Sequence, residues 1–237
     1  MARARSGERA PLWIVAREQT AGRGRQGRVW SSPPGNLYAS RLLFDPCDAE
    51  HAPQLGFVAG VAVLEAVRAL APDSGARLKW PNDLLARGAK LAGLLLEASR
   101  LPDGRLACVV GVGVNCRSHP EGLPYPATHL SALAGRNVEA DALFDRLAAS
   151  FDAWLGTWDR ARNFAAVRDA WLAGAPVSGT PIEVALPGRT VRGRFETLDM
   201  IGRLVVATDA GPVAVEAGDV RWGGAAGEPA REPASVA

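Results

Sequence analysis

The sequence of 237 residues predicts an α+β protein, with a mixed central sheet covered by helices in a large first domain and a small β-barrel after it. Two observations predict this organisation. In the first part, short apolar runs of strand length alternate with longer stretches of helical period. After the step Ala175-Pro176, short β-type runs follow one another with only turns between them. We therefore expect domains at residues 1–175 and 176–223.

Five strands are expected in the first domain. They cover residues 12–16, 37–43, 77–80, 90–97 and 106–115. The turn sequence Pro102-Asp103-Gly104 separates the last two, so these two strands are expected to form a hairpin.

Three helices are expected to cover the sheet. Residues 54–70 place apolar side chains at steps of three and four, which is the period of an amphipathic helix. A third helix begins with Asn163 as its N-cap and has an apolar side at Phe164, Val167 and Trp171. Between these two lies a helix whose apolar side is formed by Leu143, Leu147, Phe151, Trp154 and Trp158.

Four short strands are expected in the second domain, at residues 182–186, 190–197, 203–208 and 213–216. Glycine-containing turns separate them, and a domain of this size suits a small barrel that relies on packing against its neighbour. Residues 224–237 are dominated by Gly, Ala, Pro and Glu, and we expect this tail to be disordered.

The overall composition is that of an ordinary globular protein, with 48% apolar and 22% charged residues and a formal net charge of +2. A general nucleic-acid binder would carry a concentrated basic face. The three cysteines and three histidines lack the spacing of a metal site or a disulfide framework, so no metal-binding residues are assigned. No apolar run approaches the roughly 20 residues of a membrane span, and no signal-type segment is recognisable, so a cytoplasmic location without a membrane partner is expected.

The segment from Gly22 to Arg28, Gly-Arg-Gly-Arg-Gln-Gly-Arg, is the most informative in the sequence. Its spacing matches the glycine fingerprint of dinucleotide-binding proteins, but that fingerprint requires a helix directly after the last glycine. Val29-Trp30-Ser31-Ser32-Pro33-Pro34 cannot continue as a helix, so the nicotinamide interpretation fails. The loop instead combines glycines that permit close backbone approach with arginines that offer bidentate donors to phosphate and carboxylate oxygens. A solvated basic loop or an RNA-contacting patch is the alternative.

Three further clusters carry polar groups or glycines at strands. Lys79-Trp80-Pro81-Asn82-Asp83 sets an amide beside a carboxylate, which could position a nucleotide, a metal or an attacking amine. Lys90-Leu91-Ala92-Gly93 puts a lone lysine at the entry of an apolar strand, where it is either an edge lysine or a cation for an acyl-phosphate. Gly111-Val112-Gly113-Val114-Asn115 puts glycines inside a strand, which often marks the close approach of a ligand.

These four motifs, with Glu18-Gln19-Thr20-Ala21 before the first, closely resemble the biotin protein ligase family in order and spacing, over about residues 12–223. The resemblance implies a catalytic domain of the class II aminoacyl-tRNA synthetase-like, biotin/lipoate ligase type and a C-terminal barrel of Src-homology-3 type. It also implies an ATP-dependent ligase that forms a C–N bond. Biotin's carboxylate would attack the α-phosphate of ATP, and a lysine of a carrier protein would then attack biotinyl-5'-AMP.

The resemblance implies roles for individual residues as well. The catalytic residues would be Arg25, Lys90 and Asp83. Those that bind biotin would be Gln19, Arg23, Gly24, Arg25, Lys90, Gly93 and Gly111. Those that bind the nucleotide would be Arg23, Arg25, Arg28, Trp30, Asn82 and Asn115.

Positive charge is needed because the first step brings two anions together. Lys90 would bridge biotin's carboxylate and the α-phosphate, while Asp83, with Asn82, would orient either the metal-bound phosphates or the incoming amine. Mg²⁺ is expected to accompany ATP, since the charge of ATP needs a hard cation with oxygen ligands.

Two features depart from the family pattern. Family members that also act as repressors begin with a helix-turn-helix domain, for which this chain has no room, so no DNA-binding role is expected. The family also carries a Ser-Thr-Asn segment that contacts biotin's ureido ring, whereas only residues 1–11 precede the first strand here. Residues 1–10 are typical of the end of a helix and its loop, which favours a start placed too far downstream over a natural variant lacking part of its biotin pocket.

The family's usual partner is the biotin carboxyl carrier protein of acetyl-CoA carboxylase or of a related carboxylase, and a homodimer is compatible with the resemblance. The nearest rival is a lipoate or octanoate ligase on the same fold, against which the Gly-Arg-Gly-Arg loop and the C-terminal barrel argue. A weakly catalytic protein that holds adenylate without turnover is a second rival. ATP-dependent release of pyrophosphate would exclude this second rival. Strongly salt-dependent binding to polynucleotides would instead indicate an RNA-binding module.

Overall fold

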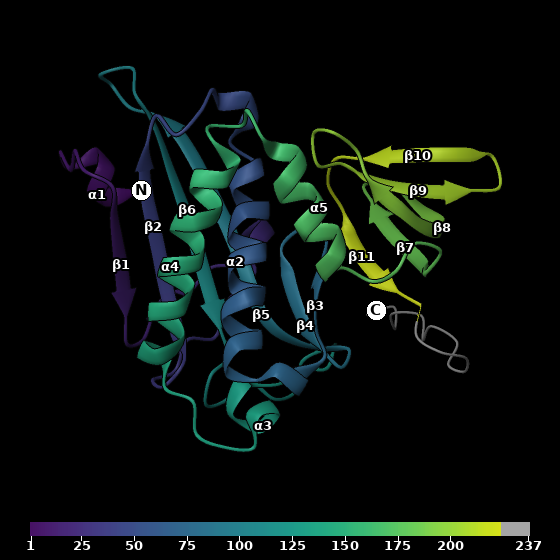
Figure 1. Cartoon of the computed structure of the whole chain (residues 1–237), viewed down its shortest axis with the longest axis horizontal. Coiled ribbons are helices and arrows are strands. Elements are labelled where there is room, and N and C mark those ends of the chain that lie inside the picture. The colour runs from purple at the N-terminus through teal and green to yellow at the C-terminus, as the bar shows by residue number, and fades with distance from the viewer. Residues whose placement is uncertain (224–237) are drawn as a thin grey trace, which may run out of the picture.

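The computed structural model describes residues 1–223, and the tail for which we expect disorder, residues 224–237, lies outside the described residues. The chain forms two units, each built on its own antiparallel sheet (Figure 1). The first sheet has six strands in the order β1-β2-β6-β5-β4-β3. These strands are β1 (Leu12–Ala16), β2 (Leu37–Phe44), β3 (Ala76–Lys79), β4 (Asp83–Ala86), β5 (Ala89–Arg100) and β6 (Leu106–Val114).

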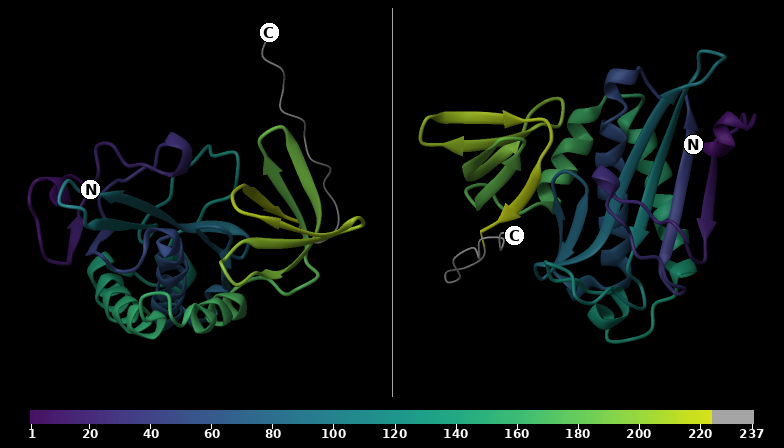
Figure 2. Two further views of the ribbon diagram at one scale, coloured as in Figure 1. Left: turned by 90° about the horizontal axis from the view of Figure 1, so that it is seen from above. Right: turned by 180° about the vertical axis from the view of Figure 1, so that it is seen from behind.

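The helices cover one face of the first sheet and leave the other face to a loop (Figure 2). Helix α2 (Gln54–Leu70) lies between α4 (Ala140–Trp158) and α5 (Phe164–Gly174), with the sheet on its remaining side (Figure 1). Two short helices, α1 (Ala2–Arg5) and α3 (Leu130–Ala134), lie at the margins. Because α2 is covered on three sides, it is buried around most of its circumference rather than along one stripe.

The long central helix corrects one expectation from the sequence. By length and composition, the segment Ala49–Leu70 is apolar enough to cross a membrane. In the folded chain, however, 67% of its apolar window is buried inside the protein, as is usual for a core helix.

The second unit is a five-stranded sheet in the order β10-β9-β8-β7-β11. Its strands are β7 (Pro181–Leu186), β8 (Arg189–Leu198), β9 (Leu204–Thr208), β10 (Gly211–Val215) and β11 (Asp219–Trp222). The edge strands β10 and β11 each pair with one neighbour only, β9 and β7 respectively. The expected barrel is therefore an open sheet over the described residues, because its two edges do not meet.

A set of buried contacts holds the second unit against the first. Trp80, which is 2% exposed, donates from its indole Nε1 to the carbonyl oxygen of Gly202 at 3.1 Å. Gly202 has φ of +90° and lies so close to Phe57 that a Cβ atom would come within 2.7 Å of the ring. Arg168 adds a bond from Nε to the carbonyl oxygen of Leu198 at 2.7 Å. These contacts hold the second sheet against the first unit.

Gly202→Ala is expected to lower the free energy of unfolding by about 2 kcal/mol, since it combines a strained φ with crowding against Phe57. Gly179→Ala is the matched control, because Gly179 has the same φ of +90° but no atom within 4 Å of the added Cβ. The control is expected to lose about 1 kcal/mol or less, the cost of strain alone. Urea unfolding measures both, and equal losses would contradict the crowded junction.

Candidate active site

The main pocket lies on the sheet face that the helices leave open, where the loop after β1 and the edge of the second sheet meet it. Its volume is about 800 Å³. Residues from both units line it, including Gln19, Arg25, Lys90, Gly111, Tyr125 and Asp219. The pocket is therefore formed jointly by the first sheet, the loop and strand β11.

The glycine-arginine loop is a hairpin folded over the pocket. Trp30 N donates to the carbonyl oxygen of Gly22 at 3.0 Å, and Gly24 N donates to that of Arg28 at 2.7 Å. The hairpin turns at residues 25–27, where Gln26 and Gly27 both have positive φ. Gly22 has no room for a side chain, since a Cβ atom would lie 2.2 Å from the carbonyl oxygen of Trp30. One glycine of the motif is thus required by close approach, as expected from the sequence.

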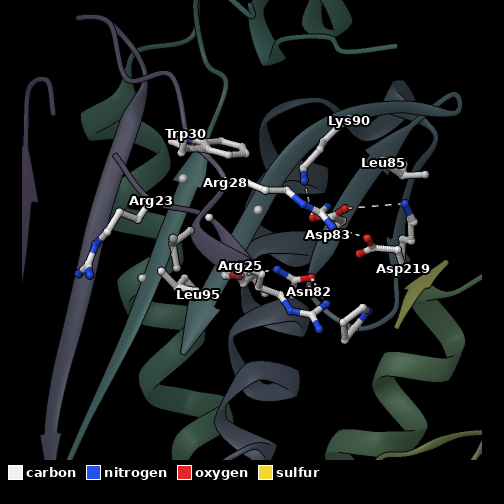
Figure 3. Close-up of a pocket in the computed structure, with 18 of the residues that line it drawn as sticks. Arg23, Arg25, Arg28, Trp30, Asn82, Asp83, Leu85, Lys90, Leu95 and Asp219 are labelled. Atoms are coloured by element: carbon white, nitrogen blue, oxygen red, sulfur yellow. Dashed lines mark hydrogen bonds and ion pairs between the residues drawn. The ribbon is translucent and has the colours of Figure 1, made fainter. Parts of the chain in front are cut away.

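A carboxylate at the centre of the site, that of Asp83, lies between two lysines, of which Figure 3 shows Lys90. Asp83 Oδ1 lies 2.7 Å from Lys90 Nζ, and its Oδ2 lies 3.8 Å from Lys79 Nζ. Burial lowers the pKa of Lys79, an effect that Asp83 opposes and that the charge of Lys90 reinforces. Lys79 and Lys90 are the only two lysines in the 237-residue sequence. Every lysine ammonium of this chain is therefore at the pocket.

Two arginines of the hairpin, Arg25 and Arg28, lie near this cluster. Arg25 Nη1 donates to Asn82 Oδ1 at 3.3 Å, and Asn82 is itself held by a 2.6 Å bond from its Nδ2 to the carbonyl oxygen of Leu94. Arg28 forms an ion pair with Asp219 of β11 (Figure 3). The structure thus brings together Arg25, Arg28, Asn82, Asp83 and Lys90, all of which the sequence had indicated.

The floor of the pocket is made of two glycines that face each other across β5 and β6. Gly93 pairs with Gly113, and the ring of Trp30 lies against both. A Cβ atom on Gly113 would come within 2.7 Å of the Trp30 indole nitrogen, and one on Gly93 within 3.1 Å of the ring. Lys90 Nζ lies 5.5 Å from the centroid of the same ring, within cation–π range. Gly113, which the sequence analysis left without a role, is the more crowded of the two.

Other predicted residues lie further from the charged cluster. Arg23 pairs with Glu97 at 3.1 Å, and Figure 3 shows its guanidinium directed away from Lys90 and Asp83. Gln19 accepts a bond from the hydroxyl of Ser32 at 2.8 Å at the base of the hairpin. Gly24 and Gly111 line the pocket wall.

Asn115 is placed behind the pocket rather than in it. It is 3% exposed, does not line the pocket, and donates from Nδ2 to the carbonyl oxygen of Thr128 at 3.0 Å. Thr128 N donates in turn to the carbonyl oxygen of Lys90 at 2.9 Å, and Lys90 N donates to that of Pro126 at 2.8 Å. Asn115 therefore supports the segment that lies beside Lys90.

Sequence reasoning missed two parts of the wall. Pro124, Tyr125 and Pro126 line the pocket, and Lys90 Nζ lies 5.7 Å from the Tyr125 ring centroid. Strand β11 contributes Asp219 and Trp222. The Pro-Tyr-Pro triplet was a usable signal, since it is rigid and aromatic. Strand β11, Asp-Val-Arg-Trp, alternates polar and apolar residues, but a run of four residues is too short for that pattern to predict a strand.

The arrangement suits an anionic ligand with an uncharged end. Both lysines, Arg25 and Arg28 gather at one end, whereas glycines, Leu95, Tyr38 and the Arg23–Glu97 ion pair line the other parts. Within residues 1–223 no group of three or more His, Cys, Asp or Glu side chains could hold a metal ion.

Comparison with known proteins identifies the family. The profile of the biotin/lipoate A/B protein ligase family matches residues 5–115, and that of the biotin protein ligase C terminal domain matches residues 177–221. A biotin--[acetyl-CoA-carboxylase] ligase of Paracoccus denitrificans is 38% identical over 218 residues, which cover 90% of each chain. Another, of Mycobacterium tuberculosis, is 35% identical and covers 87% of this chain and 77% of the relative.

Solved structures agree with the sequence comparison. A biotin protein ligase from Aquifex aeolicus in complex with biotin and ATP is similar with a TM-score of 0.77 and 27% identity, covering 89% of each chain. The chain belongs to the biotin protein ligase family.

Proposed function

We propose that this chain activates biotin with ATP to biotinyl-5'-AMP and transfers biotin to a lysine of a biotin carboxyl carrier protein. The single observation that carries the proposal is the pocket in which Lys90, Arg25 and Arg28 converge beside an uncharged floor of glycines. The named relatives are biotin--[acetyl-CoA-carboxylase] ligases, so a carrier of acetyl-CoA carboxylase is the acceptor class they favour.

In the first step, a carboxylate oxygen of biotin forms a bond to the α-phosphorus of ATP, and the bond from that phosphorus to pyrophosphate breaks. Both reactants are anions, so their approach must be offset by fixed positive charge. Lys90 is suited to lie between them, because its ammonium is at the pocket and is held by Asp83 at 2.7 Å. Arg25 and Arg28 extend from the hairpin and suit the remaining phosphate oxygens.

In the second step, the amine of the carrier lysine attacks the acyl carbon of the mixed anhydride, an amide bond forms, and AMP leaves. The contacts of Asp83 favour a third role besides the two expected from the sequence, the positioning of Lys90, since both of its carboxylate oxygens face lysines of this chain. Asp83 then keeps Lys90 aimed at the reacting groups. The hairpin over the pocket also limits access of water to the anhydride.

Biotin's ring end is expected to lie away from Lys90. If the carboxylate meets Lys90, the valeryl chain runs over the Gly93 floor, and the rings reach the wall formed by Gly111, Leu95 and Tyr38. Gln19 and Arg23 lie toward the same end, where amide and guanidinium groups can hydrogen-bond a ureido ring. Trp30 lies between the two ends and can cover the adenylate.

Mg²⁺ is expected to arrive with ATP, bound mainly by phosphate oxygens. Asp83 is occupied by two lysines and Asp219 by Arg28, so the described residues supply no dedicated cage for a hard cation. The ion would add charge neutralisation for the phosphates.

A lipoate ligase is the closest alternative, because the family profile over residues 5–115 includes biotin and lipoate enzymes alike. The match of residues 177–221 to the biotin protein ligase C terminal domain favours biotin.

Incubation of the protein with ATP, Mg²⁺, biotin and a carrier domain is expected to add biotin to the carrier, as read by mass spectrometry, with no adduct from lipoate. Lys90→Ala is expected to lower ATP–pyrophosphate exchange by roughly 100-fold or more, the usual effect of removing a group that stabilises developing charge. Arg192→Ala is the control, because Arg192 pairs with Glu183 on the second sheet and does not line the pocket. A lipoyl adduct, or full exchange in Lys90→Ala, would contradict the assignment.

Gly113→Ala is expected to raise the KM for biotin and ATP by roughly tenfold while leaving the thermal midpoint nearly unchanged, because the added methyl displaces the Trp30 ring over the floor. Steady-state exchange kinetics measure this effect. Gly156→Ala adds a methyl where no atom lies within 4 Å and is expected to behave as wild type. Unchanged kinetics in Gly113→Ala would show that substrate binding does not depend on the contact between Trp30 and Gly113.

A further inference from the structure

Asp219 is the acidic residue that the second unit contributes to the pocket wall. It opens β11, which is fixed by antiparallel pairing of Asp219 with Ala185 and of Val220 with Val184 on β7. Val220 is 3% exposed and anchors the strand in the core of that sheet. The backbone that carries the Asp219 carboxylate is thus firmly held, while about half of its side chain remains exposed.

The partner of Asp219 is Arg28, on the returning limb of the hairpin. Arg28 Nη2 donates to two acceptors, the Asp219 carboxylate and Gln26 Oε1, the latter at 2.8 Å. Gln26 belongs to the hairpin itself, so Asp219 is the partner of Arg28 that lies outside it. Because the second unit is seated by the Trp80–Gly202 and Arg168–Leu198 bonds, it offers this arginine a fixed acceptor.

The pair also balances the charges of the site. Arg28 lowers the pKa of Lys79, whereas Asp219 raises it, so the two groups act on the same cluster with opposite sign. Without Asp219, Arg28 would lose its paired carboxylate, while the nearby Asp83 already pairs with both Lys79 and Lys90. Repulsion would then favour a swing of Arg28 into solvent, since more than half of its side chain is already exposed.

We propose that Asp219 is a positioning residue for ATP binding, which acts through Arg28 and couples the C-terminal unit to the hairpin that closes the pocket. The inference rests on the proposed function. Before the nucleotide arrives, Asp219 holds Arg28 at the pocket mouth. The phosphates of ATP then replace the carboxylate as the acceptor, so the arginine needs little reordering at that moment.

The test is a double-mutant cycle of Asp219→Ala and Arg28→Ala, with the KM for ATP, the KM for biotin and kcat measured by pyrophosphate exchange. Asp219→Ala is expected to raise the KM for ATP about fivefold, in the range of an exposed ion pair, with little change in kcat or in the KM for biotin. The double variant is expected to match Arg28→Ala alone, since Asp219 acts through that arginine. Asp219→Glu is expected to restore the KM, and Glu183→Gln on the adjoining strand β7 is the control carboxylate.

Hydrogen exchange of the hairpin gives a readout that does not depend on activity. Asp219→Ala is expected to speed amide exchange in residues 20–32 and to leave residues 182–198 unchanged, whether or not the protein turns over biotin. Additive effects in the cycle, or unchanged exchange in the hairpin, would overturn the role of Asp219 while leaving the ligase activity intact. Absence of biotin-dependent pyrophosphate exchange in the wild-type protein would instead overturn the proposed function.

Discussion

The site depends on one carboxylate that is shared by two lysines. Asp83 begins β4, directly after the turn that follows Lys79, and its backbone pairs with both Lys79 and Gly93. The strand meander β3-β4-β5 places Asp83 opposite Lys79, and places Lys90 opposite Leu85, from where the Lys90 side chain reaches the Asp83 carboxylate. Two ammonium groups close together would repel each other, and burial of Lys79 would favour its neutral form. The carboxylate offsets both effects and keeps Lys90 in place.

The rest of the pocket surrounds the cluster of Lys79, Asp83 and Lys90. The Gly93–Gly113 pair lies on one side of this cluster and leaves space for the ring of Trp30. The hairpin brings Arg25 and Arg28 to the cluster, and the second unit contributes Asp219 to the pocket wall. Residues of both units line the pocket, and Trp80, whose buried contact with Gly202 joins the units, precedes Asn82 by two residues in the chain.

Helices and strands could be predicted well wherever apolar residues repeat at a regular spacing in the sequence. The bounds of α2 and the N-cap position of α5 at Asn163 were correct, because long runs with buried faces leave little freedom. The prediction failed for β4 and β11, which have four residues each and are defined by pairing with distant strands. The small C-terminal β-domain was predicted correctly, but its sheet is not closed into a barrel over the described residues, and turn spacing does not tell whether β10 and β11 meet.

Most candidate site residues could be identified because their motifs flank the pocket, but their individual contacts could not. No local pattern showed that Arg23 would pair with Glu97, that Asn115 would face Thr128, or that Asp219 would reach Arg28. These contacts join residues of different elements, so side-chain geometry decides them. Gly113 shows the same limit, since its neighbour Gly111 fits the motif equally well until the position of Trp30 is known.

The measurement that tests the central claim most directly is the titration of Lys79 by NMR. With isotope-labelled lysine and the substitution Lys90→Arg, Lys79 is the only lysine left in the chain. We expect the pKa of Lys79 to lie below the ordinary value for lysine, because the side chain is buried, and to fall further in the additional variant Asp83→Asn, because the carboxylate opposes the effect of burial. A pKa of Lys79 that does not change when Asp83 is neutralised would contradict the shared carboxylate.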